Sequence, residues 1–517
     1  TIEFLMKTEN HKIKFALFVS AFFLMSNFLA QNDLLKLLPG SRKANYYENN
    51  DLLKLEGNVH FEYQGNTMYC DSAYYFEKRR IVHAYGKVHI IKDKINMFCD
   101  SALFNGKAER AKLWGNVRAR DLDYRLTTDS LEYISASGRA VYKNYGTIKK
   151  NGSNEMIVSK VGYFYPESKN YFFSDSVVYT NDGIRMTTDT LSYEYANKKT
   201  VFNGKTTIIK DSMTMTCLFG WYNTESNKGY LHGDASYKDK SQILYADTIS
   251  YDEEIEEIIA KKDVHLINEK SNYELNSNYM YTSDSLEITY ITDCAIAKLI
   301  QQKDTIYIHS DTLFILNDSI EGNKNIKAYF GVKIYNNDIQ SICDSLWFSQ
   351  TQNKIKLYHN PIVWSENSEL KGDSIVIITK DSLIDKINIY RNSSAIMELD
   401  SGLLYNQISG KNIVAFMKDG KLHKTDVNGS AVSIYFPEDE EKTDSVSTIK
   451  RMGLNKLISS TLSVYLDSGE VVGINYVNEP VGIFYPMDQI KEKDRWIRNF
   501  KWNPALRPED EFSLTED

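Results

Sequence analysis

The sequence predicts an all-β fold built from a repeat of roughly 29 residues. Three observations support this: one short phrase recurs at a fixed interval, apolar residues alternate with period two, and the composition favours strands. Aromatic residues make up 13% of the 517 residues, with 36 Tyr and 23 Phe against only 8 Pro. In a repeat architecture each unit is too small to bury its own apolar face and must stack on its neighbours. We therefore expect function to extend along the stack rather than to lie in one pocket.

The repeated phrase has two halves. Three Gly-x-Val phrases start 29 residues apart, at Gly57-Asn58-Val59, Gly86-Lys87-Val88 and Gly115-Asn116-Val117. Fourteen residues after each Gly stands an Asp, preceded by a small residue and followed by Ser, as in Cys70-Asp71-Ser72. Apolar residues alternate on each side of the Asp, and the alternation slips by one residue at that point. We expect a bend or β-bulge there, between two strand segments.

The pattern extends through most of the chain. Copies recur around Asp189, Asp247, Asp311, Asp344 and Asp373, with degenerate copies between them, and weaker ones continue to about residue 485. Strands are most often about five or six residues long, so a unit of this size has room for roughly three strands and their turns. Helical periodicity is nearly absent.

The pattern also divides the chain into segments. Residues 1–30 read as a leader, and residues 31–51 as a lead-in that covers the first edge of the stack. Regular repeats occupy 52–250, and more divergent ones 251–436. An acidic, Ser/Thr-rich insertion at 437–456 is expected to be a mobile loop. A last repeat at 457–490 precedes a tail, 491–517, that breaks the pattern and is expected to cap or dock.

The leader has the features of a signal peptide. Lys7, Lys12 and Lys14 precede the apolar run 15–29, and Ala30-Gln31 is the expected cleavage point. This predicts export, and an uncleaved membrane anchor is the alternative. Cleavage would change the net charge from −8 to about −9. An acidic chain without a basic stripe disfavours nucleic acid as a partner.

Four of the five cysteines share one repeat position, namely Cys70, Cys99, Cys217 and Cys343, whereas Cys294 stands apart. Two interpretations remain open: small core side chains, or a disulfide between neighbouring units such as Cys70 and Cys99. No CxxC motif or His/Cys metal-binding spacing occurs.

The recurrent Asp residues allow two interpretations as well. Stacked carboxylates could bind Ca²⁺, but each Asp at a strand bend could also accept hydrogen bonds from turn amides, which we favour. His60 and His89 share a repeat position with Arg118, which cannot ligate a metal, so we expect them on a solvated outer face. No nucleophile elbow, phosphate-binding loop or acid pair recurs at a special place, so the sequence predicts neither an enzyme nor a cofactor.

The candidate site is the row of apolar residues that should share one side of the sheets. It is either a dry core or a groove that holds acyl chains. The candidate groove residues are Val59, Phe61, Met68, Ala73, Val88, Ile90, Met97, Val117, Leu126 and Leu131.

The Gly-Asn-Val phrase with its following Asp resembles the OstA-like family of lipopolysaccharide-transport proteins, which includes the periplasmic bridge LptA. The best-matching residues are Gly57-Asn58-Val59 with Asp71, Gly86-Lys87-Val88 with Asp100, and Gly115-Asn116-Val117 with Asp129. The likeness extends to about residue 377 and weakly beyond. The chain is much longer than the usual bridge protein and looks like an extended OstA-like protein of the Bacteroidetes type.

This resemblance implies a β-jellyroll folded like a taco, whose apolar interior carries the acyl chains of lipid A. It also implies a periplasmic location with outer-membrane association, and partners among other lipopolysaccharide-transport proteins through edge-strand β-augmentation. End-to-end self-association would use the same edges. The alternative hypothesis is an exported β-helical structural protein or adhesin, or a polysaccharide-binding protein.

Overall fold

The computed structural model describes residues 36–515 except 64–65, 93–94, 109, 121, 123, 135–136, 166–169, 182, 195, 224, 301–304, 318–322, 381–382, 419–420, 444–445, 468–469 and 479. The predicted leader, residues 1–30, lies outside the described residues. The chain forms two compact units, residues 1–258 and residues 259–517, and each is described by itself below.

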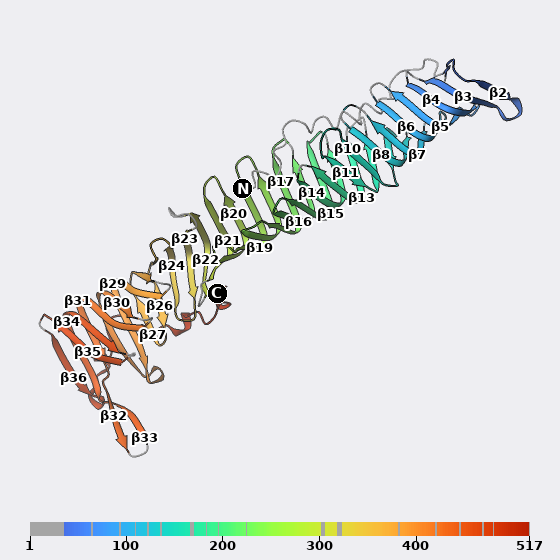
Figure 1. Cartoon of the computed structure of the whole chain (residues 1–517). Coiled ribbons are helices and arrows are strands. Elements are labelled where there is room, and N and C mark those ends of the chain that lie inside the picture. The colour runs from blue at the N-terminus through green and yellow to red at the C-terminus, as the bar shows by residue number, and fades with distance from the viewer. Residues whose placement is uncertain are drawn as a thin grey trace. The chain divides into compact units, whose positions relative to one another are not determined.

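The first unit contains strands β1–β18 and one short 3₁₀ turn, η1 (Figure 1). Their bounds are β1 Lys36–Leu37, β2 Lys43–Tyr47, η1 Glu48–Asn50, β3 Leu52–Tyr63, β4 Asn66–Phe76, β5 Ile81–Lys92, β6 Ile95–Asn105, β7 Arg110–Arg120, β8 Tyr124–Ile134, β9 Arg139–Tyr142, β10 Gly146–Lys150, β11 Met156–Ser159, β12 Val161–Tyr165, β13 Asn170–Asn181, β14 Ile184–Glu194, β15 Lys199–Lys210, β16 Met213–Asn223, β17 Lys228–Lys238 and β18 Gln242–Asp252.

Strand β19 begins at the end of the first unit, and the remaining strands belong to the second. Their bounds are β19 Glu257–Asn268, β20 Tyr273–Ser283, β21 Ile288–Ile300, β22 Thr305–Asn317, β23 Lys324–Tyr335, β24 Gln340–Ser349, β25 Lys354–Tyr358, β26 Ile362–Ser365, β27 Ser368–Lys371, β28 Ser374–Lys380, β29 Leu383–Leu399, β30 Leu404–Lys418, β31 Lys421–Tyr435, β32 Glu438–Thr443, β33 Val446–Arg451, β34 Gly453–Asp467, β35 Glu470–Val477 and β36 Val481–Pro486. The 3₁₀ turns are η3 Asp400–Gly402, η4 Met487–Gln489, η5 Glu492–Asp494, η6 Pro504–Leu506 and η7 Ser513–Thr515.

Each 29-residue repeat contributes two long strands, not the three that its length suggested. In the first repeat these are β3 and β4, of 12 and 11 residues. The expectation of three strands was wrong because the predicted bend does not end a strand. The ladder continues through it, with a register shift between Glu56/Val59 on β3 and between Tyr85/Val88 on β5.

The bend is a β-bulge made by the Gly-x pair opposite an Asp. On β5 and β6, Tyr85 pairs with Ser101 and Val88 with Cys99, so two residues, Gly86 and Lys87, oppose Asp100 alone. Both have positive φ, 73° for Gly86 and 46° for Lys87. A two-against-one bulge bends its strand sharply. The two halves of the repeated phrase therefore meet at one bend, on neighbouring strands.

The long strands of the first unit, β3–β8 and β13–β18, keep one face buried on both sides of the bend. On β6 the buried residues are Ile95, Met97 and Cys99 before Asp100, and Ala102 after it. The parity change at the bulge holds the apolar side chains on the inner face. Within this unit only strands and one short 3₁₀ turn are described, so the two halves of the sheet cover each other as two layers. The prediction of an all-β repeat of the β-jellyroll type is confirmed.

Every strand pairing whose register the structure gives is antiparallel, from β1–β3 to β34–β36. A β-helix would stack its coils in parallel. The β-helical alternative is therefore wrong. Among the described residues there is no helix long and apolar enough to cross a membrane.

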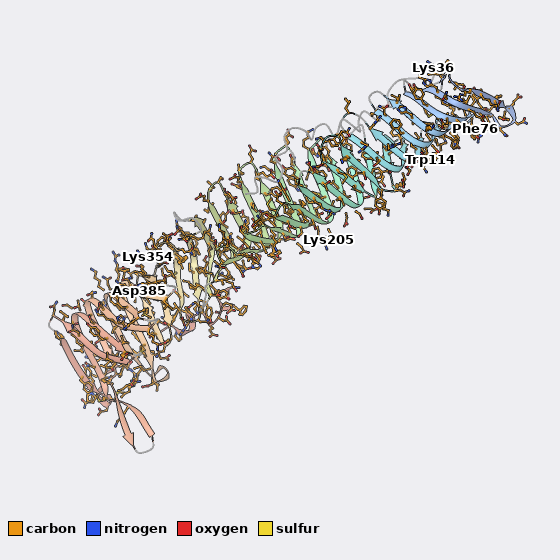
Figure 2. All side chains as sticks on the ribbon, in the orientation of Figure 1. Lys36, Phe76, Trp114, Lys205, Lys354 and Asp385 are labelled. Carbon is orange, nitrogen blue, oxygen red and sulfur yellow. The ribbon has the colours of Figure 1, made fainter. Side chains whose placement is uncertain are left out.

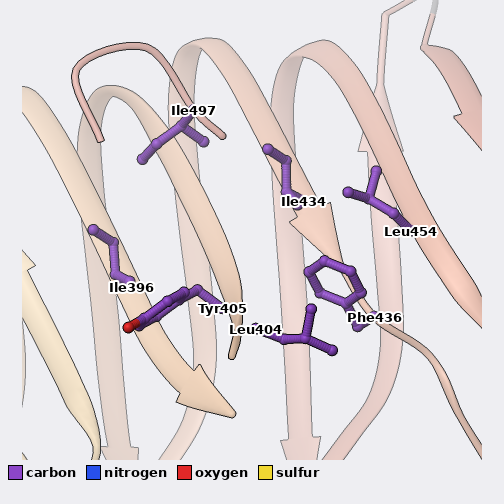
Figure 3. Packing of buried hydrophobic residues seen from close by; sticks show 7 residues of the cluster. All are labelled: Ile396, Leu404, Tyr405, Ile434, Phe436, Leu454 and Ile497. Atoms are coloured by element: carbon purple, nitrogen blue, oxygen red, sulfur yellow. The ribbon is translucent and has the colours of Figure 1, made fainter. Parts of the chain in front are cut away.

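The C-terminal tail docks on its own unit, as the sequence predicted in outline. It packs on a cluster that includes Tyr405 and Phe436, where Trp496, Phe500 and Trp502 lie against buried side chains. Figure 3 shows the buried members of the cluster, which are Ile396, Leu404, Tyr405, Ile434, Phe436, Leu454 and Ile497. Leu514, near the end of the tail, is fully buried.

Buried polar side chains hold the tail backbone in place. Gln407 donates to the Arg495 carbonyl at 3.0 Å and accepts from the Ile497 amide at 3.0 Å. Glu369, which is 0% exposed, accepts hydrogen bonds from the backbone and the side chain of Asn503. The tail thus crosses several strands at fixed points.

The acidic insertion forms a hairpin where the sequence predicted a loop. Strands β32 and β33 pair from Glu438–Arg451 to Thr443–Val446 as a separate two-stranded sheet. Arg451 at its base pairs with Asp400 at 3.0 Å and also with Glu438.

Candidate functional site

All ten candidate groove residues lie on the inner face of the first unit and are buried. The bend divides each long strand between the two layers. Eight of the ten residues lie on one layer, whereas Ala73 and Leu131, which follow the bend on their strands, lie on the other. The exposed fractions are Val59 0%, Phe61 2%, Met68 7%, Ala73 0%, Val88 1%, Ile90 5%, Met97 7%, Val117 1%, Leu126 6% and Leu131 2%. Alternation therefore assigned each side chain to the correct face.

Five of these residues belong to one continuous row, which we call the interior row. Phe61 pairs with Met68, Met68 with Ile90, and Ile90 with Met97 across successive strands. The row continues through Ala119, Leu126, Ile148, Ile157, Tyr179, Met186, Ile208, Met215, Tyr237 and Leu244. It carries no charged side chain.

The other layer carries a matching aromatic row that was not among the predicted site residues. Its signal was present in the sequence, because an aromatic residue stands four positions after most of the recurrent Asp residues. The inward aromatics of this row are Tyr75, Phe104, Tyr133, Phe164, Tyr171, Tyr193, Tyr222 and Tyr251. Small residues separate several of these aromatic residues. Gly229, for example, lies between Tyr222 and Tyr251 on neighbouring strands. A Cβ on Gly229 would lie 1.8 Å from the Tyr251 ring, so the ring occupies the space that a side chain would need.

The interior is closed around the ten candidate residues, whereas other inward residues, such as Tyr179 and Ile208 of the interior row and Tyr75 and Phe104 of the aromatic row, are half-buried. No candidate residue exceeds 7% exposure, so the two layers pack directly on each other. Apolar contacts between Met, Ile, Leu and aromatic side chains are non-directional, and Met adapts to irregular neighbours. Such a contact can be exchanged for contact with an acyl chain without loss of a hydrogen bond.

The small residue before the recurrent Asp, or at the same position in copies that lack the Asp, has a specific structural role. At the bend, Ser310 donates to the carbonyl of Thr312 at 3.1 Å, and Ser459 to that of Thr461 at 2.8 Å. The same contact from residue i to the carbonyl of residue i+2 recurs at Thr128, Ser159, Thr188, Ser277 and Cys343. A hydroxyl or thiol here satisfies a carbonyl that the bulge removes from the ladder.

The cysteines at this position are free core side chains, and the disulfide interpretation is wrong. All five cysteines are unpaired, and Cys70, Cys99, Cys217 and Cys343 are buried. Cys70 on β4 and Cys99 on β6 are separated by β5, so their Cα atoms lie roughly two strand spacings apart, about 10 Å, beyond disulfide reach. Burial raises the pKa of Cys70 to about 11 and that of Cys99 to about 12.

Where the structure gives a hydrogen bond to a recurrent Asp, the donor is a side chain and not the turn amide that we expected. Asp311 accepts from Thr312 and Asp344 from Ser345, and two others accept from the neighbouring bulge. Asn116 donates to Asp100 at 2.8 Å, and Asn392 donates to Asp373 at 2.9 Å. Among the described residues, no group of three or more His, Cys, Asp or Glu side chains comes together in a way that could hold a metal ion.

His60 and His89 lie on the outer face, as predicted. His60 stacks on Tyr69 with ring centroids 4.2 Å apart, and His89 on Phe98 at 4.3 Å. His89 also hydrogen-bonds Asn96 at 3.0 Å. Both rings are structural parts of an outward row that continues through exposed Arg118 to Thr127.

A comparison with known protein families finds a match in the N-terminal part of the chain. Residues 39–189 match the family model described as OstA-like protein. The predicted resemblance is thus confirmed for this segment, which contains all ten candidate residues. A comparison with curated protein sequences finds no match.

Among solved structures, the chain is similar to LptH of Pseudomonas aeruginosa, described as the LptA-homologous periplasmic component of the conserved lipopolysaccharide transport device. The two share 14% identity, the match covers 28% of this chain and 80% of LptH, and the TM-score is 0.14. The fold described above therefore rests on this chain's own strand pairing.

Proposed function

We propose that this chain, whose residues 39–189 are OstA-like, is a periplasmic lipopolysaccharide-transport protein that shields acyl chains between its two sheet layers. The observation that carries the proposal is the interior row, which is apolar over successive strands of the first unit and lies within the family match from Phe61 to Met186. Each buried CH₂ of an acyl chain contributes about 0.8 kcal/mol. A chain lying along the row would be held without directional bonds.

Because the interior is closed around the candidate residues, the layers must part when lipid enters. The bends fix one side of the interior, since bulge contacts such as the one between Asn116 and Asp100 recur there. The opening would therefore lie at the hairpin ends, where the aromatic row of one layer faces the interior row of the other. Binding then replaces contacts between the layers by contacts with lipid.

The edges of the sheet support a bridging role between membrane components. At the end of the second unit, β35 and β36 pair with β34, and several apolar side chains there are exposed. Val472 is 65% exposed, Val481 64% and Ile483 51%. An unpaired strand edge with apolar side chains is suited to adding a strand from a partner.

Site-specific photo-crosslinking in cells tests the proposal. A photoreactive residue at Met97 or Leu126, both on the inner face, should capture labelled lipopolysaccharide. Matched control positions are exposed Asn58 at a bulge and Thr127, which neighbours Leu126 on the outer face. Equal capture from inner and outer positions would contradict an acyl-chain interior.

A further inference from the structure

The outer face of the second unit carries a row in which Tyr and Ser alternate. Tyr329 on β23 lies opposite Ser345 on β24, which lies opposite Tyr358 on β25. Tyr358 in turn lies opposite Ser374 on β28, and Ser374 opposite Tyr390 on β29. The three Tyr side chains are 36%, 38% and 42% exposed, in chain order.

The serines keep the rings apart. Neighbouring strands are about 4.8 Å apart, so rings on every second strand stand roughly 10 Å from each other. This differs from the His60–Tyr69 pair of the first unit, whose ring centroids are 4.2 Å apart and cover one another. The three Tyr rings therefore do not stack on one another, which leaves space between them for a ligand. Phe314 and Phe330 contact the Tyr329 ring, with centroids 5.9 and 6.5 Å away.

Two adjoining hollows occupy these spaces. One, of about 330 Å³, is lined by Tyr329, Ser345, Trp347, Lys356 and Tyr358. The next, of about 400 Å³, shares Lys356 and Tyr358 with the first and extends to Ser374, Asn388 and Tyr390. Tyr358 is thus the common wall of two similar hollows, which together form what we call the Tyr-Ser groove.

The groove also carries positive charge. Lys327, Lys354 and Lys356 line it, and Lys354 is labelled in Figure 2. The Lys356 ammonium lies 4.4 Å from the centre of the Trp347 ring. Among the residues that the structure describes, none of these three lysines forms a salt bridge, in contrast to Lys371 and Lys424 of the same unit.

Two of the recurrent Asp residues, Asp344 and Asp373, directly precede Ser345 and Ser374 of the groove, and both already have partners. Asp344 accepts a hydrogen bond from Ser345 at 2.7 Å and lies 3.3 Å from His359. Asp373 accepts from Asn392 at 2.9 Å. The lysine side of the groove is therefore the side that suits an anionic group.

We propose that the Tyr-Ser groove binds an acidic oligosaccharide. A sugar ring has an apolar C–H face that packs on an aromatic ring, and its hydroxyls require polar partners such as Ser374 and Asn388. Carboxylate or phosphate groups on the sugar would pair with the lysines. The two hollows, which share Tyr358 as a wall, fit successive sugar rings of one linear oligosaccharide.

An extended acidic peptide fits this surface less well. Strands β24, β25 and β28 are paired on both sides, so the groove lies on a sheet face and has no free backbone groups for strand addition. The groove also lies on the face opposite the interior, where Leu357 and Ile375 are fully buried. Sugar binding here is therefore independent of acyl-chain binding in the first unit.

The experiment is isothermal titration of the full chain with four probes. They are hexagalacturonate as an acidic sugar, delipidated lipopolysaccharide oligosaccharide, maltohexaose as a neutral sugar, and poly-glutamate as an acidic polymer without sugar rings. Either of the first two should bind, and salt should weaken that binding. Which of them binds identifies the source of the sugar. Binding of neither, or binding of poly-glutamate with equal affinity, would overturn the proposal.

Variants locate the site. Tyr358→Ala should weaken the affinity at least about tenfold, the factor that 1.4 kcal/mol represents, and Lys356→Gln should weaken it and reduce its salt dependence. Tyr358→Phe should keep the affinity because the ring remains. Tyr245→Ala is the matched control, since Tyr245 is 45% exposed on the first unit. Unchanged affinity in Tyr358→Ala and Lys356→Gln would exclude the Tyr-Ser groove as the binding site.

Discussion

Asn116 on β7 donates a hydrogen bond to the Asp100 carboxylate on β6 at 2.8 Å. The Gly before it, Gly115, has φ +77°, and a Cβ added there would lie 2.5 Å from the same carboxylate oxygen. The same crowding recurs at Gly86 with Asp71 and at Gly204 with Asp189. These three bends therefore require a residue without a side chain beside an Asp that reaches across from the neighbouring strand, whereas other bends, such as the one at Asp293-Cys294, have no Gly.

We expect Gly115→Ala to destabilise the first unit by both strain and crowding. Gly152→Ala is a matched control, because Gly152 has φ +76° but nothing within 4 Å of the added Cβ. The control should lose about 1 kcal/mol from backbone strain, and Gly115→Ala at least about 1 kcal/mol more from overpacking. Urea unfolding measures both. Equal losses would show that Asp100 does not crowd this position.

Thr188→Val should destabilise the bend by about 1–3 kcal/mol. Thr188 lies 2.8 Å from Thr206, oxygen to oxygen, and also donates to the carbonyl of Thr190. Both threonines are buried; valine removes the donor to the Thr190 carbonyl and the contact with Thr206, which keeps its hydrogen bond to the Gly204 carbonyl. Thr188→Ser keeps the hydroxyl and should cost clearly less in the same urea titration. If valine and serine cost the same, then the hydroxyl contact does not stabilise the bend.

Gln407→Ala should release the tail from the second unit. The Arg495 carbonyl and the Ile497 amide would both lose their partner. We expect faster amide hydrogen exchange in residues 495–507 and in strands β30 and β31, with β4–β8 unchanged. Phe512→Ala is the control within the same tail, because Phe512 is 73% exposed. Unchanged exchange in the tail would show that its apolar contacts alone hold it.

The buried thiols make stability fall at alkaline pH. Burial raises the pKa of Cys217 to about 11 and that of Cys343 to about 12, as it does for Cys70 and Cys99. A raised pKa in the folded state stabilises the fold while the thiol stays protonated, below the unfolded value of about 8.5. That contribution is lost as pH rises through about 11 to 12, so the urea midpoint should decline from about pH 9 upwards.

Replacing these four cysteines by serine tests the cause of the decline. Serine already occupies the same bend position at Ser159, Ser277 and Ser310, so the variant should fold. Its urea midpoint should decline less between pH 8 and pH 11 than that of the native chain. Thiol labelling at pH 8 gives an independent check, since only Cys294 is exposed. One reactive thiol is expected before unfolding and five after it.

Much of the first unit could be predicted from sequence. The inward face of every candidate residue from Val59 to Leu131, the bend at each Asp and the outward position of His60 and His89 all follow from period-two alternation, which is a local property of a strand. The number of strands per repeat could not be predicted in this way. A bulge and a turn both interrupt the alternation, and only the pairing of Tyr85 with Ser101 and Val88 with Cys99 shows that the ladder continues.

The sequence by itself therefore determined the all-β repeat, its inner and outer faces and the position of its bends. Only the tertiary structure decided that the two layers close on each other, that the tail docks through Gln407 and Glu369, and that Tyr329, Tyr358 and Tyr390 align across a sheet. The reason is physical: alternation depends on neighbours along the chain, whereas closure, docking and cross-strand alignment depend on contacts between residues far apart in sequence.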